Sequence, residues 1–190
     1  MTTMDQAVEL LRTVIRQEDE AQQLIWTSTD TAEMDRRVAE VNKHFGGGLL
    51  SEVARPRTLR DDHLQRGQKQ LRVLGPRLLF KVERYDTRGL GPVFRAYVSS
   101  HLKDYTTYAA SLLVADQGEG PRIVSQYNLC WTCEGSGKAG GKTCPDCGGA
   151  GWLRVGGLDV GDLRQLGEPV EVRKIQPPSD SKHLADYEAR

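Results

Sequence analysis

Hydrophobic residues in the first part of the chain recur at helical spacing. Over residues 3–26 they form an apolar stripe, and Thr3 and Gln6 have the spacing of a capping box at its start. A second helix is expected to begin near Asp30 and to end at the glycines 46–48. Each helix should therefore direct one apolar face toward a core. The inward positions are Val8, Leu11, Ile15 and Ile25 in the first helix and Met34, Val38, Val41 and Phe45 in the second.

A weaker helical pattern covers residues 58–73, and after Pro76 the hydrophobic period changes to two, which is the period of a strand. Four runs with this alternation follow, and the short turns between them favour an antiparallel meander. Two further strands are expected later in the chain. The four runs are residues 77–85, 93–102, 105–115 and 122–129, and the later strands are residues 152–155 and 169–175.

The second of these runs predicts a sheet with two different faces. Because side chains alternate along a strand, Phe94 and Val98 share one face, while Arg95, Tyr97 and His101 share the other. We expect the first face to lie against the helices and the second to be polar and half exposed to solvent. The predicted class is therefore α+β, with N-terminal helices packed on an antiparallel sheet of about four strands.

This order of elements resembles the cone-shaped fold of the nuclear-transport-factor-like and SnoaL-like superfamily, over roughly residues 4–129. The resemblance rests on the pattern of helices and strands, and it implies a curved sheet wrapped around the helices. Members of that superfamily include isomerases, cyclases, small-molecule binders and protein-interaction domains. The resemblance therefore implies a fold and no single function.

All four cysteines lie between residues 130 and 151, in the stretch CWTCEGSGKAGGKTCPDCGGAG. They form two copies of the unit C-x-x-C-x-G-x-G, whose glycines allow the backbone to curl toward the sulfur atoms. Two such pairs facing each other give a closed tetrahedral site with Zn–S bonds of about 2.3 Å and no vacant position for substrate. We weigh redox dithiols and disulfides as alternatives, and the spacing favours metal. The prediction is one structural zinc ion, held by Cys130, Cys133, Cys144 and Cys147.

The repeated unit resembles the cysteine-rich zinc region of DnaJ-type co-chaperones and of small DnaJ-like zinc-finger proteins, over about residues 130–152. This chain has two repeats where that family has four, and it lacks the His-Pro-Asp signature of the J-domain. Stimulation of a chaperone ATPase is therefore not implied. The resemblance implies a zinc hairpin of the kind that can hold client polypeptides or assembly partners.

Composition and charge narrow the classes of partner. The chain has 26 Lys and Arg and 26 Asp and Glu, so that a balanced charge disfavours nucleic acid as a partner. No apolar run reaches the ~20 residues of a membrane helix, and nothing resembles a secretion signal, so we expect a cytoplasmic protein. We divide the chain into an α+β domain (1–129), a zinc ribbon (130–152) and C-terminal strands with a polar tail (153–190).

Two functions of different classes follow from these features. The first, which we favour, is a non-enzymatic, chaperone-like interaction or assembly module whose partner is a protein that contacts Trp131 and Trp152. The second is a small-molecule binder or an isomerase-like or cyclase-like enzyme, in which Tyr97 and His101 would line a pocket in the sheet. The sequence leaves the partner's identity and the oligomeric state open, including a homodimer.

Overall fold

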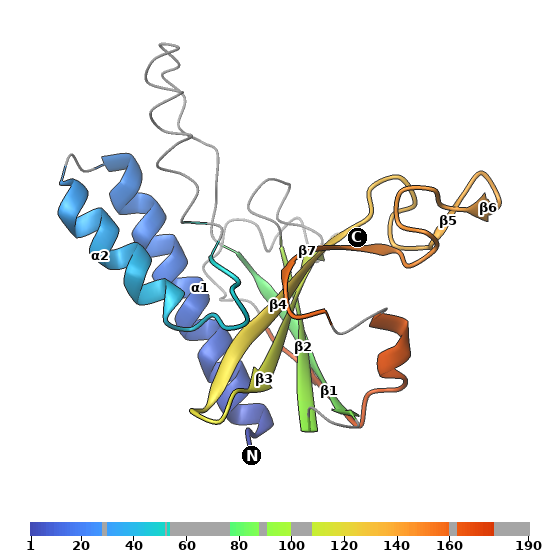
Figure 1. Cartoon of the computed structure of the whole chain (residues 1–190), viewed down its shortest axis with the longest axis horizontal. Helices are drawn as coiled ribbons and strands as arrows, with labels where there is room; N and C mark the ends of the chain where they lie inside the picture. Colours follow the sequence, from blue (N-terminus) through green and yellow to red (C-terminus); the bar gives the residue numbers. More distant parts are fainter. Residues whose placement is uncertain are drawn as a thin grey trace, which may run out of the picture.

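The computed structural model describes residues 1–27, 30–51, 53, 77–87, 91–99, 108–159 and 163–176. Within these residues, two helices, α1 (Met4–Thr27) and α2 (Thr31–Asn42), lie side by side along one face of a sheet (Figure 1). The cysteine hairpin projects from the sheet on the side away from the helices (Figure 1). The α+β class that the hydrophobic pattern predicted is confirmed.

The sheet has six strands in the order β7-β4-β3-β2-β1-β8, and every neighbouring pair is antiparallel. The prediction of about four strands was wrong, because the two later strands join the edges of the same sheet. The cysteine hairpin turns the chain back so that β7 pairs with β4, and β8 pairs with β1. The strands are β1 (Leu79–Thr87), β2 (Gly91–Ser99), β3 (Tyr108–Asp116), β4 (Pro121–Leu129), β7 (Trp152–Gly157) and β8 (Glu171–Lys174), and β5 (Lys138–Ala139) pairs separately with β6 (Lys142–Thr143).

Both helices begin where their capping residues predicted. At the start of α1 the Thr3 N–H donates to Gln6 Oε1 at 2.9 Å, and the Gln6 N–H donates to Thr3 Oγ1 at 3.3 Å, which completes the capping box. At the start of α2 the Asp30 side chain accepts a hydrogen bond of 3.0 Å from the Glu33 N–H. These bonds satisfy N–H groups that the first turn of a helix leaves without partners.

The main core lies between the two helices and one face of the sheet. It includes Phe94 and Val98 of β2, both fully buried, as their place on the apolar face predicted. Phe45 follows the end of α2 and is also buried, in a bridge to Ile123 of β4. The other helix positions in this core are Met4, Ala7, Val8, Leu11, Val14, Ala21 and Val41.

The second face of the sheet is buried as well, and the expectation of a half-exposed polar face was wrong. Arg95 is 8% exposed and Tyr97 is 7% exposed. The reason is that the chain after β7 returns across this face. Trp152, Leu158 and the short 3-10 helix η2 (Leu163–Leu166) pack there against apolar residues of β2, β3 and β4. Most polar groups on this face are therefore expected to form their hydrogen bonds inside the protein.

Several predicted features lie outside the described residues, and they stay predictions. They include the third helix over residues 58–73, His101, and the polar tail from residue 177 onward. In the part of the chain that the structure does describe, no helix is both long enough and apolar enough to cross a membrane.

Candidate metal centre

The sheet itself positions the cysteine hairpin. Cys130 follows the last residue of β4 directly, and Gly151 precedes the first residue of β7. The Cys130 N–H donates a hydrogen bond of 2.9 Å to the Gly151 carbonyl, which extends the ladder between β4 and β7 by one more bond. The hairpin is therefore a continuation of two paired strands, and its orientation is fixed by the sheet.

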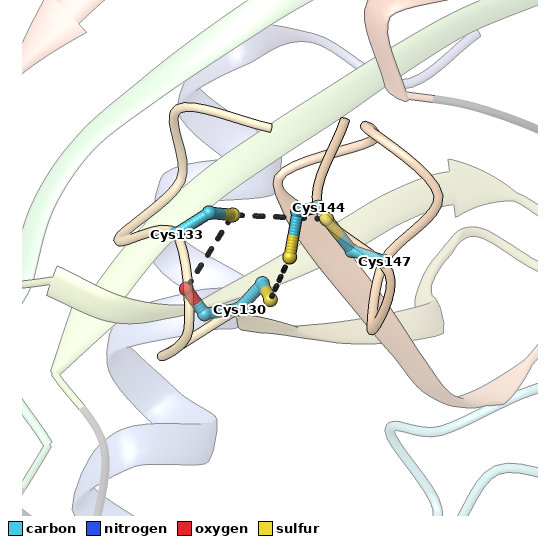
Figure 2. A group of neighbouring side chains, drawn as sticks. All are labelled: Cys130, Cys133, Cys144 and Cys147. Atoms are coloured by element: carbon cyan, nitrogen blue, oxygen red, sulfur yellow. Dashed lines mark hydrogen bonds between the residues drawn. The ribbon is translucent and has the colours of Figure 1, made fainter. Parts of the chain in front are cut away.

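The four cysteine side chains converge on one point (Figure 2). The sulfur of Cys130 lies 3.7 Å from that of Cys144, and the sulfur of Cys133 lies 3.7 Å from that of Cys147. All four sulfur atoms lie within 4.8 Å of one another. A tetrahedral ion with metal–sulfur bonds of about 2.3 Å would set its sulfur atoms about 3.8 Å apart, whereas a disulfide bond measures about 2.05 Å. The four thiols are free and have the spacing of a metal site.

The two copies of the repeat are related by an approximate two-fold arrangement, and each closes the other. The Cys130 N–H bonds to the carbonyl of Gly151 in the second copy, and the Cys144 N–H bonds at the same length, 2.9 Å, to the carbonyl of Gly137 in the first. Within each copy a further turn is closed in the same way, by Ser136 N–H to Cys133 O and by Ala150 N–H to Cys147 O. The hairpin is thus two equivalent knuckles held face to face.

Two glycines are required by close contact between these knuckles. A Cβ atom on Gly137 would lie 2.2 Å from the carbonyl oxygen of Gly149, and one on Gly151 would lie 2.3 Å from that of Gly135. Neither distance is sterically allowed, because the neighbouring atoms are backbone. The second glycine of each repeat therefore packs against the backbone of the other repeat, which explains why that position is glycine in both copies.

The electrostatics of the four cysteine thiols favour a bound cation. Burial raises the pKa of the Cys130 thiol to about 12. Burial also raises the pKa of Cys147, but two opposing effects outweigh burial and lower this pKa to about 7. They are the hydrogen bond from the Gly151 N–H, which lies 3.2 Å from the Cys147 Sγ, and the neighbouring thiols. The four thiols cannot all ionise together in this space without a positive charge among them. A divalent metal would supply that charge.

The two tryptophans of the hairpin have different surroundings. Trp131 lies between the first two cysteines and is 45% exposed. Trp152, at the base of the hairpin, is partly buried on the second face of the sheet, where its ring meets the Tyr97 ring edge to face with centroids 6.1 Å apart. Of the predicted contact residues, Trp131 is therefore the one presented outward.

Tyr97 belongs to a buried polar cluster that the sequence analysis did not identify. Its hydroxyl and that of Tyr85 both donate to Glu83 Oε2, at 2.7 and 2.5 Å, and the Lys81 ammonium donates to Oε1 at 2.7 Å. Burial raises the pKa of Tyr97, and its hydrogen bond to Glu83 acts in the same direction, so the phenol stays protonated. The available signal was alternation along the strand, which places Lys81, Glu83 and Tyr85 on one face.

No family model matches this chain, and neither the curated proteins nor the solved structures contain a match to it. The resemblances to DnaJ-type zinc regions and to the nuclear-transport-factor-like fold stay predictions. What the fold and the site define together is an α+β protein that carries a four-cysteine site able to hold one metal ion.

Proposed function

We propose that this chain is a zinc-binding protein-interaction module, in which the cysteine hairpin is the contact surface. The observation that carries the proposal is a closed set of four thiols with an exposed tryptophan between two of them. Thiolates are soft ligands, and a tetrahedral set of four is characteristic of zinc in structural sites. Such a site leaves no open position for a substrate or an activated water, so its role is to hold the hairpin in shape.

The exposure of Trp131 supports the proposal that the partner is a protein. The hairpin has few large apolar side chains, yet it presents an indole ring that is 45% exposed between two of the candidate metal ligands. Tryptophan combines a large apolar area with a hydrogen-bond donor, and it is among the residues most enriched at the energetic centres of protein interfaces. The resemblance to DnaJ-type zinc regions adds a chaperone-like or assembly role to this proposal. Trp152 would support the hairpin from below.

Trp131→Ala is expected to weaken binding of the protein partner by about 2 kcal/mol or more, which is roughly a 30-fold loss of affinity. Partners captured from the native host by the zinc-loaded protein would be compared between the wild type and the variant at equal zinc content. The matched control is Val170→Ala, because Val170 is also exposed (59%) but lies next to the opposite edge of the sheet. A partner retained equally by Trp131→Ala and by the wild type would contradict the proposal.

Glu134→Gly is expected to strengthen zinc binding. Among the described residues, Glu134 is the one non-glycine residue with positive φ, at 49°, and the equivalent position in the second repeat is Gly148, at 58°. The left-handed conformation costs an ordinary residue about 1–2 kcal/mol. Glycine does not have this cost, so the substitution should raise the zinc affinity by roughly fivefold.

Competition with a zinc chelator measures this effect. Gly148→Ala is the matched reverse change, and it should weaken zinc binding because it introduces the same backbone cost in the second repeat. Equal affinities for Glu134→Gly, Gly148→Ala and the wild type would show that the backbone conformation of these knuckles does not limit metal binding.

The small-molecule alternative has one observation in its favour, which is the buried polar cluster around Glu83 and Tyr97. Tyr97 is a hydrogen-bond donor there, and because its pKa is raised it is not suited to accept a proton. In this alternative the cluster would bind and orient a ligand. Tyr97→Phe should then remove ligand binding and leave capture of the protein partner unchanged.

A further inference from the structure

The Arg95 guanidinium lies against two aromatic rings on the second face of the sheet. Its Nε donates a hydrogen bond of 3.0 Å to Ser111 Oγ. Its guanidinium carbon lies 4.5 Å from the centroid of the Tyr97 ring and 4.9 Å from that of Trp152, and these two rings meet at 78°. A guanidinium fixed by stacking and by one hydrogen bond loses little further freedom when it binds a ligand.

The carboxylate nearest in register does not neutralise Arg95. Glu83 is its direct partner across the β1–β2 pair, where opposite charges commonly interact. Glu83 instead binds the Lys81 ammonium and two tyrosine hydroxyls. Among the described residues no carboxylate forms an ion pair with Arg95. Within that part of the chain Glu83 and Lys81 balance each other, and Arg95 has no counter-charge.

The two Nη atoms of Arg95 are the part of the side chain available to a ligand. The residue is 92% buried, with 8% of its surface exposed, and Nε is the guanidinium nitrogen that has a hydrogen-bond partner among the described residues. Neither Nη atom is among the fully enclosed polar atoms that lack a partner, so both are reached by solvent. A buried, uncompensated guanidinium is costly, and an anion that accepts from both Nη atoms would relieve that cost.

We propose that Arg95 is the anion-binding residue of a ligand site on this face, and that the site takes a small organic molecule carrying a carboxylate or phosphate group. The paired Nη atoms match the two oxygens of such a group. Tyr97 is covered by Lys81 and Arg95, but the Trp152 ring beside the guanidinium is only partly buried and supplies an aromatic surface on which an apolar or aromatic body can pack. A few convergent polar groups with aromatic walls are typical of small-molecule sites.

This site is distinct from the metal centre and from the proposed partner contact. It shares no residue with the four thiols, and Trp131 takes no part in it. Loss of partner binding in Trp131→Ala would therefore leave anion binding intact, and failure to bind anions would leave the zinc module unaffected.

Binding is tested with the zinc-loaded protein labelled with ¹⁵N in its arginine side chains. Benzoate is the carboxylate probe, phenyl phosphate the phosphate probe and benzyl alcohol the uncharged control. The Arg95 Nε–H signal should shift saturably with benzoate or phenyl phosphate, with a dissociation constant of about 1 mM or tighter, and should not shift with benzyl alcohol. The tighter of the two anions identifies the group that the site prefers.

Two variants then test whether anion binding needs the paired Nη donors of Arg95 or only its positive charge. Arg95→Lys keeps the charge but loses the paired Nη donors, so the affinity for the preferred anion should fall about tenfold. Arg84→Lys is the matched control on β1, where Arg84 already pairs with Asp86 at 3.0 Å, and it should bind like the wild type. Circular dichroism and zinc content confirm that each variant is folded.

Three results with the small-molecule probes would overturn the proposal. They are the absence of a saturable shift at Arg95 with either anion, an equal shift with benzyl alcohol, and an unchanged affinity in folded Arg95→Lys. Saturation by an acidic peptide, with no response to either small anion, would also overturn it, because the site would then recognise a polypeptide. The wild-type titration is decisive even if a variant fails to fold.

Discussion

Cys133→Ser is expected to abolish stoichiometric zinc binding and to disorder the hairpin, while the helices and the six-stranded sheet stay folded. The serine hydroxyl is a poor replacement for one of four convergent thiolates. Binding of structural zinc contributes roughly 10–16 kcal/mol to the folding of small zinc peptides. The hairpin has little apolar surface whose burial could replace this stabilisation. No hairpin residue belongs to the main core between the helices and the sheet, so the loss should remain local.

Elemental analysis of freshly purified, reduced protein checks the metal, with about one equivalent of zinc expected in the wild type and less than about half in the variant. Limited proteolysis should cut the variant within residues 130–151, and circular dichroism should keep its helical signal. Lys142→Ser is the matched control, because Lys142 is exposed on β6 and is not a ligand. Global unfolding of Cys133→Ser, or a wild type without metal, would contradict this prediction.

Glu18→Ala should destabilise the whole fold by about 3–5 kcal/mol. Glu18 is fully buried in α1, where its Oε1 accepts a hydrogen bond of 2.5 Å from the Ser51 hydroxyl. Its Oε2 lies 3.7 Å from Nη1 of Arg77, whose side chain is 1% exposed, just before β1. Removing the carboxylate would take away a buried counter-charge that links the helix to the sheet, and water cannot replace it.

A surface pair of the same length provides the control. Glu20 and Arg37 are also 3.7 Å apart, but their side chains are 47% and 39% exposed. Glu20→Ala should therefore change the free energy of unfolding by no more than about 1 kcal/mol. Thermal or urea unfolding followed by circular dichroism compares the two variants, and equal stabilities would show that the buried pair does not hold α1 against the sheet.

Local features of this protein could be predicted from its sequence, because neighbours along the chain determine them. The clustering of the four cysteines follows from two repeats of one short unit, whose spacing and glycines need no distant residue. The capping boundaries of α1 and α2 depend on residues three positions apart, Thr3 with Gln6 and Asp30 with Glu33. The apolar face of β2 follows from alternation in one strand, and both Phe94 and Val98 lie in the core.

Only the tertiary structure decided which polar residues are buried. Glu18 continues the apolar stripe of α1, but the sequence could not show that Arg77 would meet it, because no local rule connects the two positions. Arg95 and Tyr97 alternate with apolar residues as a solvated face would, and they became buried because the chain after β7 crosses that face. Burial of a polar group depends on what covers it, and here the covering chain comes from the other side of the cysteine hairpin.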